Sequence, residues 1–130
     1  MALQQCGLNL SGTSRELQPH GSTEFPCAGY ASRHTQRQED DIPWHWHDEI
    51  ELISLAEGQM NVSTPSASFL LEKGRLAAIN SGVPHAASAV GECSLRSLVF
   101  SPALICGSDD SVFARKYMRP LAACKAFSGV

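Results

Sequence analysis

Apolar and polar residues alternate with a period of two in a series of short runs between residues 42 and 100. Because successive side chains of a strand point to opposite faces, this alternation predicts strands with one buried face. The runs are separated by Gly, Pro, Asn and Asp residues, which favour turns. We expect strands over residues 25–31, 44–47, 50–56, 59–64, 69–71, 76–79, 85–90 and 94–100. Short strands at this spacing are typical of a sandwich or barrel and not of alternating strand–helix units.

Helical spacing is found only near the C-terminal end. Asp109 and Asp110 would start a helix favourably, because acidic groups stabilise the positive N-terminal end of the helix dipole. Phe113, Tyr117 and Met118 would form an apolar stripe on this helix, and Pro120 is expected to end it. The stripe would either cover the barrel or form part of a dimer interface, and the sequence leaves both open.

The chain of 130 residues predicts a single domain with three parts. Residues 1–24 are rich in Gln, Ser, Gly and Thr and predict a loosely held arm. Residues 25–105 would form a mainly β barrel with a core that includes alternating apolar residues such as Met60 and Val62. Residues 106–130 would contain the short C-terminal helix.

Charge and cysteine content exclude several classes of function. The chain has 10 Lys and Arg against 13 Asp and Glu, which is not the basic balance of a domain that grips DNA by itself. Its five cysteines form no CxxC pair, so a zinc knuckle or a disulfide scaffold is not indicated, and Cys93 is expected to be a buried thiol. No apolar run is long enough to span a membrane, and the first 15 residues do not resemble a signal peptide. We therefore expect a cytoplasmic protein with no membrane partner.

The segment His45-Trp46-His47 carries the most informative chemistry. Residues two apart in a strand point the same way, so His45 and His47 share one face. Trp44 and Trp46 could line a ligand site by stacking, but their place opposite the histidines favours packing on the outer face, against the arm or a partner subunit. A turn at residues 48–49 would fold the next strand back and bring Glu51 beside the histidine pair.

A third imidazole, His85, would arrive from a separate strand, aimed inward by the turn Gly82-Val83-Pro84. Three imidazoles and one carboxylate suit Fe, Mn, Ni, Zn or Cu, with positions left open for water or a ligand. The same groups could instead bind a small molecule without metal. Arg96, in the middle of a predicted strand, is a further candidate for pairing with an anionic effector. His20 and His34 lie in polar segments and are expected to have no specific role.

The spacing of these residues resembles the two short motifs of the cupin superfamily. His45, His47, Glu51 and Gly58 match the first motif, and Gly74, Gly82 and His85 match the second. Glu39, Asn80 and Ala89 stand where the motifs usually have glycine, proline and asparagine. The resemblance implies a cupin barrel, also called a double-stranded β-helix or jelly-roll-like barrel. It leaves the choice of a particular cupin enzyme open.

A closer likeness extends over most of the chain. Residues 20–26, 43–51, 80–85, 98–100 and 116–121 resemble the sensor domains of AraC-type transcription regulators. In that family an N-terminal cupin barrel binds a small-molecule effector and often forms a homodimer, and a C-terminal domain with helix-turn-helix units binds DNA. The resemblance implies the first part alone, so we expect the protein to continue beyond Val130 into a DNA-binding domain that this chain lacks.

Three functions remain to be compared. The leading hypothesis is a ligand-sensing and dimerisation domain with no catalytic residues, in which His45, His47, Glu51, His85 and Arg96 contact the effector. The alternative is a small metal-dependent cupin enzyme, a dioxygenase or an isomerase. The third is a dimerisation scaffold whose pocket has lost its ligand.

Overall fold

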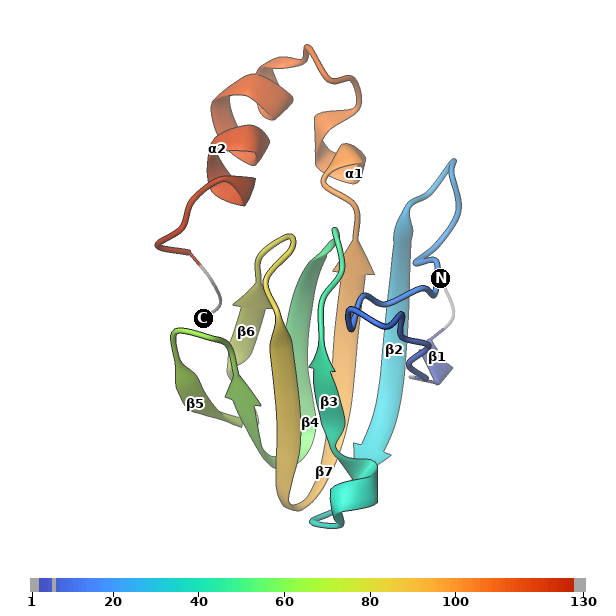
Figure 1. Cartoon of the computed structure of the whole chain (residues 1–130), viewed down its shortest axis with the longest axis vertical. Helices are drawn as coiled ribbons and strands as arrows, with labels where there is room; N and C mark the ends of the chain where they lie inside the picture. Colours follow the sequence, from blue (N-terminus) through green and yellow to red (C-terminus); the bar gives the residue numbers. More distant parts are fainter. Residues whose placement is uncertain (1–2, 6, 128–130) are drawn as a thin grey trace.

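Two long, bent strands form the centre of a single sheet that folds over on itself (Figure 1). The computed structural model describes residues 3–5 and 7–127, so residues 1–2 of the predicted arm, Cys6 and residues 128–130 lie outside the description. The strands are β1 (Gln4–Gln5), β2 (Cys27–His34), β3 (Ile42–His45), β4 (Ile50–Ser63), β5 (Ser68–Glu72), β6 (Leu76–Ile79) and β7 (His85–Phe100). The helical segments are a 3₁₀ turn (Gln38–Asp40), α1 (Ala103–Cys106), a π turn (Ala114–Met118) and α2 (Arg119–Ala122).

Strands β4 and β7 pair antiparallel along nearly their whole length, and each has different neighbours in its two halves. The half formed by residues 50–57 and 93–100 is flanked by β6 and β2. The other half, formed by residues 59–63 and 85–90, is flanked by β5 and β3. The bend brings these two halves face to face, which gives the double-stranded β-helix expected from the sequence. The fold is therefore mainly β, as predicted.

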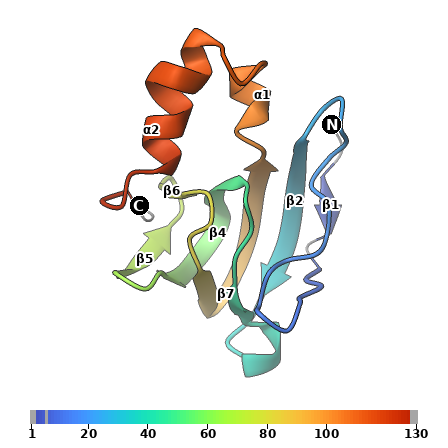
Figure 2. The ribbon, with the colours of Figure 1, turned by 45° about the horizontal axis from the view of Figure 1, so that its top comes forward.

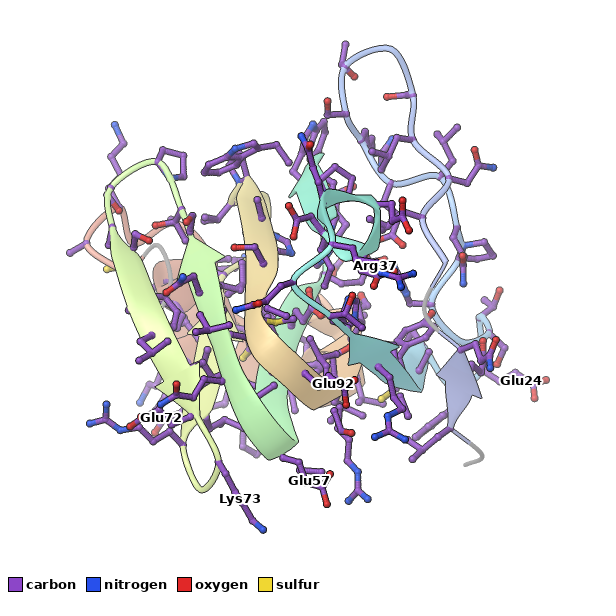
Figure 3. The ribbon with its side chains drawn as sticks, turned by 90° about the horizontal axis from the view of Figure 1, so that it is seen from below. Glu24, Arg37, Glu57, Glu72, Lys73 and Glu92 are labelled. Atoms are coloured by element: carbon purple, nitrogen blue, oxygen red, sulfur yellow. The ribbon has the colours of Figure 1, made fainter. Side chains whose placement is uncertain are left out.

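The bends lie at Gly58 and Gly91, both of which have a φ of +82°. A turn was expected at residues 57–58, but β4 continues through it as a bulge, with a register shift on each side of Glu57. That expectation is wrong because a glycine with positive φ can kink a strand without ending it. Glu57 and Glu92 project outward at this end of the molecule (Figure 3).

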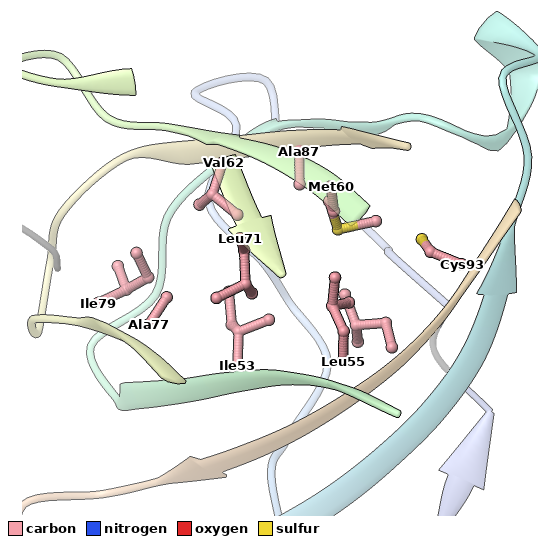
Figure 4. Close-up of a cluster of buried hydrophobic side chains, with 10 residues drawn as sticks. Ile53, Leu55, Met60, Val62, Leu71, Ala77, Ile79, Ala87 and Cys93 are labelled. Atoms are coloured by element: carbon pink, nitrogen blue, oxygen red, sulfur yellow. The ribbon is translucent and has the colours of Figure 1, made fainter. Parts of the chain in front are cut away.

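The main core fills the space between the two halves of the sheet (Figure 4). Met60 and Val62 are completely buried, and Cys93 is also buried, as the sequence predicts. Phe69 is partly buried and packs against this cluster. The described residues do not include Cys6, and the cysteines among them are free thiols.

The described residues of the arm before β2 lie along the barrel and are bonded to it, so this part of the arm is not loosely held. β1 adds to the sheet in parallel with β2. Trp46 accepts a backbone bond from Glu16 N–H at 2.9 Å and donates its own N–H to Ser14 O at 3.1 Å. Its indole Nε1–H also donates to Thr13 O at 3.0 Å. Trp46 thus packs on the arm as predicted, whereas Trp44 is half exposed.

The C-terminal helix differs from its prediction at both ends. Residues 112–122 are helical, and the Ser111 hydroxyl oxygen caps the first turn by accepting the Ala114 N–H. Pro120 was expected to end the helix but lies inside it. The helix accommodates Pro120 through the preceding π turn, because a wider turn relaxes the i−4 bonding pattern that proline cannot complete. α1 was not predicted. Within the described residues no helix is both long and apolar enough to cross a membrane.

Candidate metal and ligand site

Four buried side chains meet at one end of the barrel, near the arm. His45 ends β3, His47 lies two residues beyond, Glu51 is in β4 and His85 begins β7. One ligand atom from each of the four lies within 4.8 Å of the others. The convergence expected from the sequence is therefore present, and the binding role of this His–Glu cluster stays a prediction.

Strand pairing explains how residues so distant in sequence come together. β3 pairs antiparallel with β7, and His45 stands directly opposite His85, with ring centroids 4.2 Å apart. The backbone of His47 is fixed to the turn before β7, because Gly82 donates its N–H to His47 O at 2.8 Å. The turn after β3 returns the chain into β4, which places Glu51 beside His47 and His85.

All three imidazoles bond to the backbone through the same ring nitrogen. The bonds run from His45 Nδ1 to Pro43 O at 2.8 Å, from His47 Nδ1 to Glu49 O at 3.2 Å, and from His85 Nδ1 to Val83 O at 2.9 Å. Because a carbonyl oxygen only accepts, we infer that each Nδ1 carries a hydrogen. The neutral tautomer then leaves the Nε2 lone pair available. Metal-binding histidines are commonly oriented in this way.

Glu51 contacts the Nε2 atoms of two of these histidines. Its Oε2 lies 3.0 Å from His85 Nε2 and 3.3 Å from His47 Nε2. An unprotonated Nε2 and a carboxylate oxygen both carry lone pairs, so contacts this short require a proton or a metal ion between them. The side chains of the cluster are therefore arranged to hold a positive charge, either a proton or a metal ion.

The pKa values of the cluster reflect the same geometry. Burial disfavours the carboxylate of Glu51, but the hydrogen bonds from His47 and His85 outweigh it and hold the pKa of Glu51 well below its usual range. Burial also disfavours a charged His47, yet the bond and the charge of Glu51 raise its pKa. For His45, burial and the nearby His85 lower the pKa.

A small cavity adjoins the cluster. Its volume is ≈ 30 Å³. His45, Glu51 and His85 form part of its wall, and the apolar part includes Ile53, Val62, Leu95 and Val99. A ligand in this cavity would contact the polar cluster on one side and hydrocarbon on the other.

Arg96, the remaining predicted ligand-binding residue, does not face this cavity. Its neighbours Leu95 and Ser97 line the cavity, whereas Arg96 is exposed on the other face of β7. The prediction that Arg96 lies in the pocket is wrong. The prediction that Arg96 lies in a strand was correct. However, a shift of one residue in strand register moves a side chain to the opposite face of the sheet, so the sequence did not determine which face Arg96 occupies.

Residues 29–122 match the family described as the AraC-like ligand binding domain. The chain belongs to this family. A curated relative in Bacillus subtilis (strain 168), an uncharacterized HTH-type transcriptional regulator named YdeC, is 29% identical over 107 residues. The match covers 80% of this chain but 37% of the relative, so the chain spans well under half of that protein.

Solved structures share the fold of this AraC-like domain. An RmlC-like cupin with a double-stranded β-helix fold from Methanocaldococcus jannaschii aligns with a TM-score of 0.53 and 8% identity, over 58% of this chain and 70% of that chain. DMSP lyase DddQ from Ruegeria pomeroyi DSS-3 aligns with a TM-score of 0.52 and 19% identity, over 58% and 38%. These likenesses confirm the cupin fold.

The AraC-like domain also has a second buried polar group, which the sequence did not reveal. His20 Nε2 lies 3.1 Å from Glu16 Oε2, and His20 Nδ1 lies 2.6 Å from the Tyr30 hydroxyl. All three side chains line the cavity, and the His20 ring stands 5.6 Å from that of His47. Burial disfavours a charged His20, but the bond and charge of Glu16 outweigh it and raise its pKa.

His20 and His34 were expected to have no specific role, and His20 does not fit that expectation. The polar composition around it indicated a loose arm, whereas the backbone bonds to Trp46 fold the arm over the cavity. The only signal in the sequence was the four-residue spacing of Glu16 and His20. This spacing does not indicate a site unless the path of the arm over the cavity is known. His34 is buried too, but it bonds Ser32 Oγ and Asp40 O and is absent from the cavity wall.

Proposed function

We propose that this chain is the sensing domain of a transcription regulator, and that a small effector binds in the cavity beside a divalent metal ion held by the His–Glu cluster. The observation that supports this most directly is the orientation of three imidazoles by backbone carbonyls, with each Nε2 free of a backbone partner and Glu51 among them. Membership of the AraC-like ligand binding domain family supports the sensing role.

The donor set fits a metal ion. Three imidazole nitrogens and one carboxylate oxygen are ligands for Fe, Mn, Ni, Zn or Cu. When bound, the metal would supply an open position for an oxygen or nitrogen atom of the effector. Ile53 and Leu95 would exclude water from the effector's apolar part, and the Glu16–His20–Tyr30 group would hydrogen-bond its polar atoms.

The proposed DNA partner is based on the relative, YdeC. YdeC is described as an HTH-type regulator and is much longer than this chain, so we propose that DNA is contacted by a separate domain, in the cytoplasm. Effector binding would change the regulator by favouring one of two arrangements of the sensing domain. We further propose that the domain forms a homodimer.

The test is a calorimetric titration of the chelator-treated chain with Zn²⁺, Ni²⁺, Mn²⁺ and Fe²⁺. One ion should bind per chain, and a variant with both His47→Ala and His85→Ala should lose this binding while it remains folded. The matched control is His34→Gln, which removes a buried, hydrogen-bonded imidazole outside the cluster. Undiminished binding in the double variant would reject the metal site.

A metal-dependent enzyme is the second candidate. The same ligand set could serve catalysis, and the aligned R. pomeroyi protein is described as a DMSP lyase. The iron-loaded chain should be screened for oxygen uptake and for turnover of small organic acids. Sustained turnover at one iron per chain would favour an enzyme over a sensor, because a sensor needs binding alone.

A further inference from the structure

The turn between β6 and β7 joins the His–Glu cluster to the C-terminal helix. Ile79, the last residue of β6, pairs with Glu51. Asn80 follows at once and is almost completely buried, with 2% of its surface exposed. The turn closes with Val83 N–H donating to Asn80 O at 3.2 Å, and β7 then begins at His85.

On one side this turn is bonded to the segment that carries His47. Ser81 Oγ donates to Asp48 O at 2.6 Å, and Gly82 N–H donates to His47 O at 2.8 Å. The turn also provides Val83 O, which orients His85 through its Nδ1. A shift of His47 or His85 on ligand binding would therefore be transmitted to the turn through these short hydrogen bonds.

On the other side the turn holds the end of the helix. The Asn80 amide donates from Nδ2 to Leu121 O at 2.9 Å and to Phe127 O at 3.1 Å, and its Oδ1 accepts the Ser81 N–H at 2.9 Å. The last carbonyls of a helix have no partner within the helix, so a buried amide there fixes its end in place. Figure 2 shows the end of α2 standing over the loop between β6 and β7.

We propose that the turn formed by Asn80, Ser81 and Gly82 couples occupancy of the His–Glu cluster to the docking of α2. This rests on the proposed function, in which the cluster binds a metal ion. Asn80 is the positioning residue of the coupling, because one amide bonds both the turn and the helix end. Under the proposed function, α2 lies on the path to the DNA-binding domain, so its docking is a means of passing the signal on.

The test measures amide hydrogen exchange in residues 119–127 of the full chain, with and without Zn²⁺. Zn²⁺ should slow this exchange roughly fivefold or more, the lower end of typical coupling between two sites. The Asn80→Asp variant keeps the acceptor for Ser81 N–H but turns a carboxylate oxygen toward the helix carbonyls. It should still bind Zn²⁺ and lose the slowing. Asn61→Asp, an equal change at an exposed position of β4, is the control and should behave as the wild type.

Equal slowing in the Asn80→Asp variant, or bound Zn²⁺ with unchanged exchange in the wild type, would overturn the coupling. If Zn²⁺ does not bind at all, the proposed metal site is rejected. The coupling is then tested by a double-mutant cycle on the metal-free chain. His85→Gln should then speed exchange in residues 119–127 in the wild-type background and have no further effect beside Asn80→Asp. Additive effects of the two substitutions would mean that the turn carries no coupling.

Discussion

At the scale of single residues, Glu51 determines the chemistry of the cluster. It is the one carboxylate among three imidazoles, and both of its histidine contacts use the same oxygen. A buried carboxylate persists only where bonds to positive groups offset its lost hydration. The metal-free chain must therefore hold protons between Glu51 and its histidines, and a bound metal ion must displace them.

This leads to a pH-dependent effect of Glu51→Gln on the metal-free chain. The pKa of Glu51 is lowered from 4.5 in the folded state, so its contribution to stability is present above pH 4.5 and is lost as the pH falls. The pKa of His47 is raised from 6.5, so its contribution is complete below pH 6.5 and is lost as the pH rises. The difference in unfolding free energy between wild type and Glu51→Gln should therefore be greatest between these two values. We expect about 2 kcal/mol there, as for bonds to charged groups.

Urea denaturation in the presence of a chelator, at a series of pH values, measures this difference. Glu92→Gln, at an exposed position near the bend, is the control and should show a small difference at every pH. If the effect of Glu51→Gln does not decrease from pH 6 to pH 8.5, His47 is not the proton donor that the contact distance implies.

At the scale of elements, the bends in β4 and β7 make the barrel possible. Gly58 allows β4 to turn without ending, and it lies directly against the other long strand. A Cβ atom at this position would come within 2.3 Å of Glu92 O and 2.7 Å of Cys93 Cβ. Both the positive φ and the contact therefore require glycine here.

Gly58→Ala should consequently destabilise the chain by about 3 kcal/mol, the sum of a strained φ and a backbone clash. Gly74→Ala is the matched control, because Gly74 also has a positive φ, of +85°, but its added Cβ would meet no atom within 4 Å. It should cost about 1 kcal/mol. The two variants are compared by thermal and urea denaturation. Equal costs would show that the close approach to β7 does not hold in solution.

The C-terminal helix divides the apolar stripe that the sequence predicts into a buried part and an exposed part. Ala114 and Met118 are the residues buried on this helix, whereas Phe113 and Tyr117 are 58% and 60% exposed. Met118 of the predicted stripe is thus buried, whereas Phe113 and Tyr117 face away from the barrel and are available for the proposed homodimer. We expect Phe113→Ser combined with Tyr117→Ser to reduce self-association with little change in stability, measured by analytical ultracentrifugation. Leu76→Ser, which removes an equally exposed apolar residue on β6, is the control.

At the scale of the whole molecule, the sequence predicted the strands and the convergence of the four cluster residues, but not where the arm and the outer face of β7 lie. The HxH spacing alone put His45 and His47 on one face, because period-two geometry is local. The face of Arg96, the course of the arm over the cavity and the roles of His20 and Tyr30 depend on long-range pairing. The bends at Gly58 and Gly91 were read as breaks, because a glycine with positive φ looks the same in a turn and in a bulge.

Metal binding should stabilise the molecule as a whole, because the proposed ligands come from β3, the turn after it, β4 and β7 and meet only when the sheet is folded. At a free Zn²⁺ concentration of 100 times its Kd, the linkage relation gives about 2.7 kcal/mol of added stability. The gain should shrink as the pH falls below 6.5, since protons on the histidines, above all His47 with its raised pKa, compete with the ion. Thermal unfolding with Zn²⁺ or chelator at pH 7.5 and pH 5.5 measures both effects. A stabilisation that is equal at the two pH values, or that persists in Glu51→Gln, would place the bound ion outside the cluster.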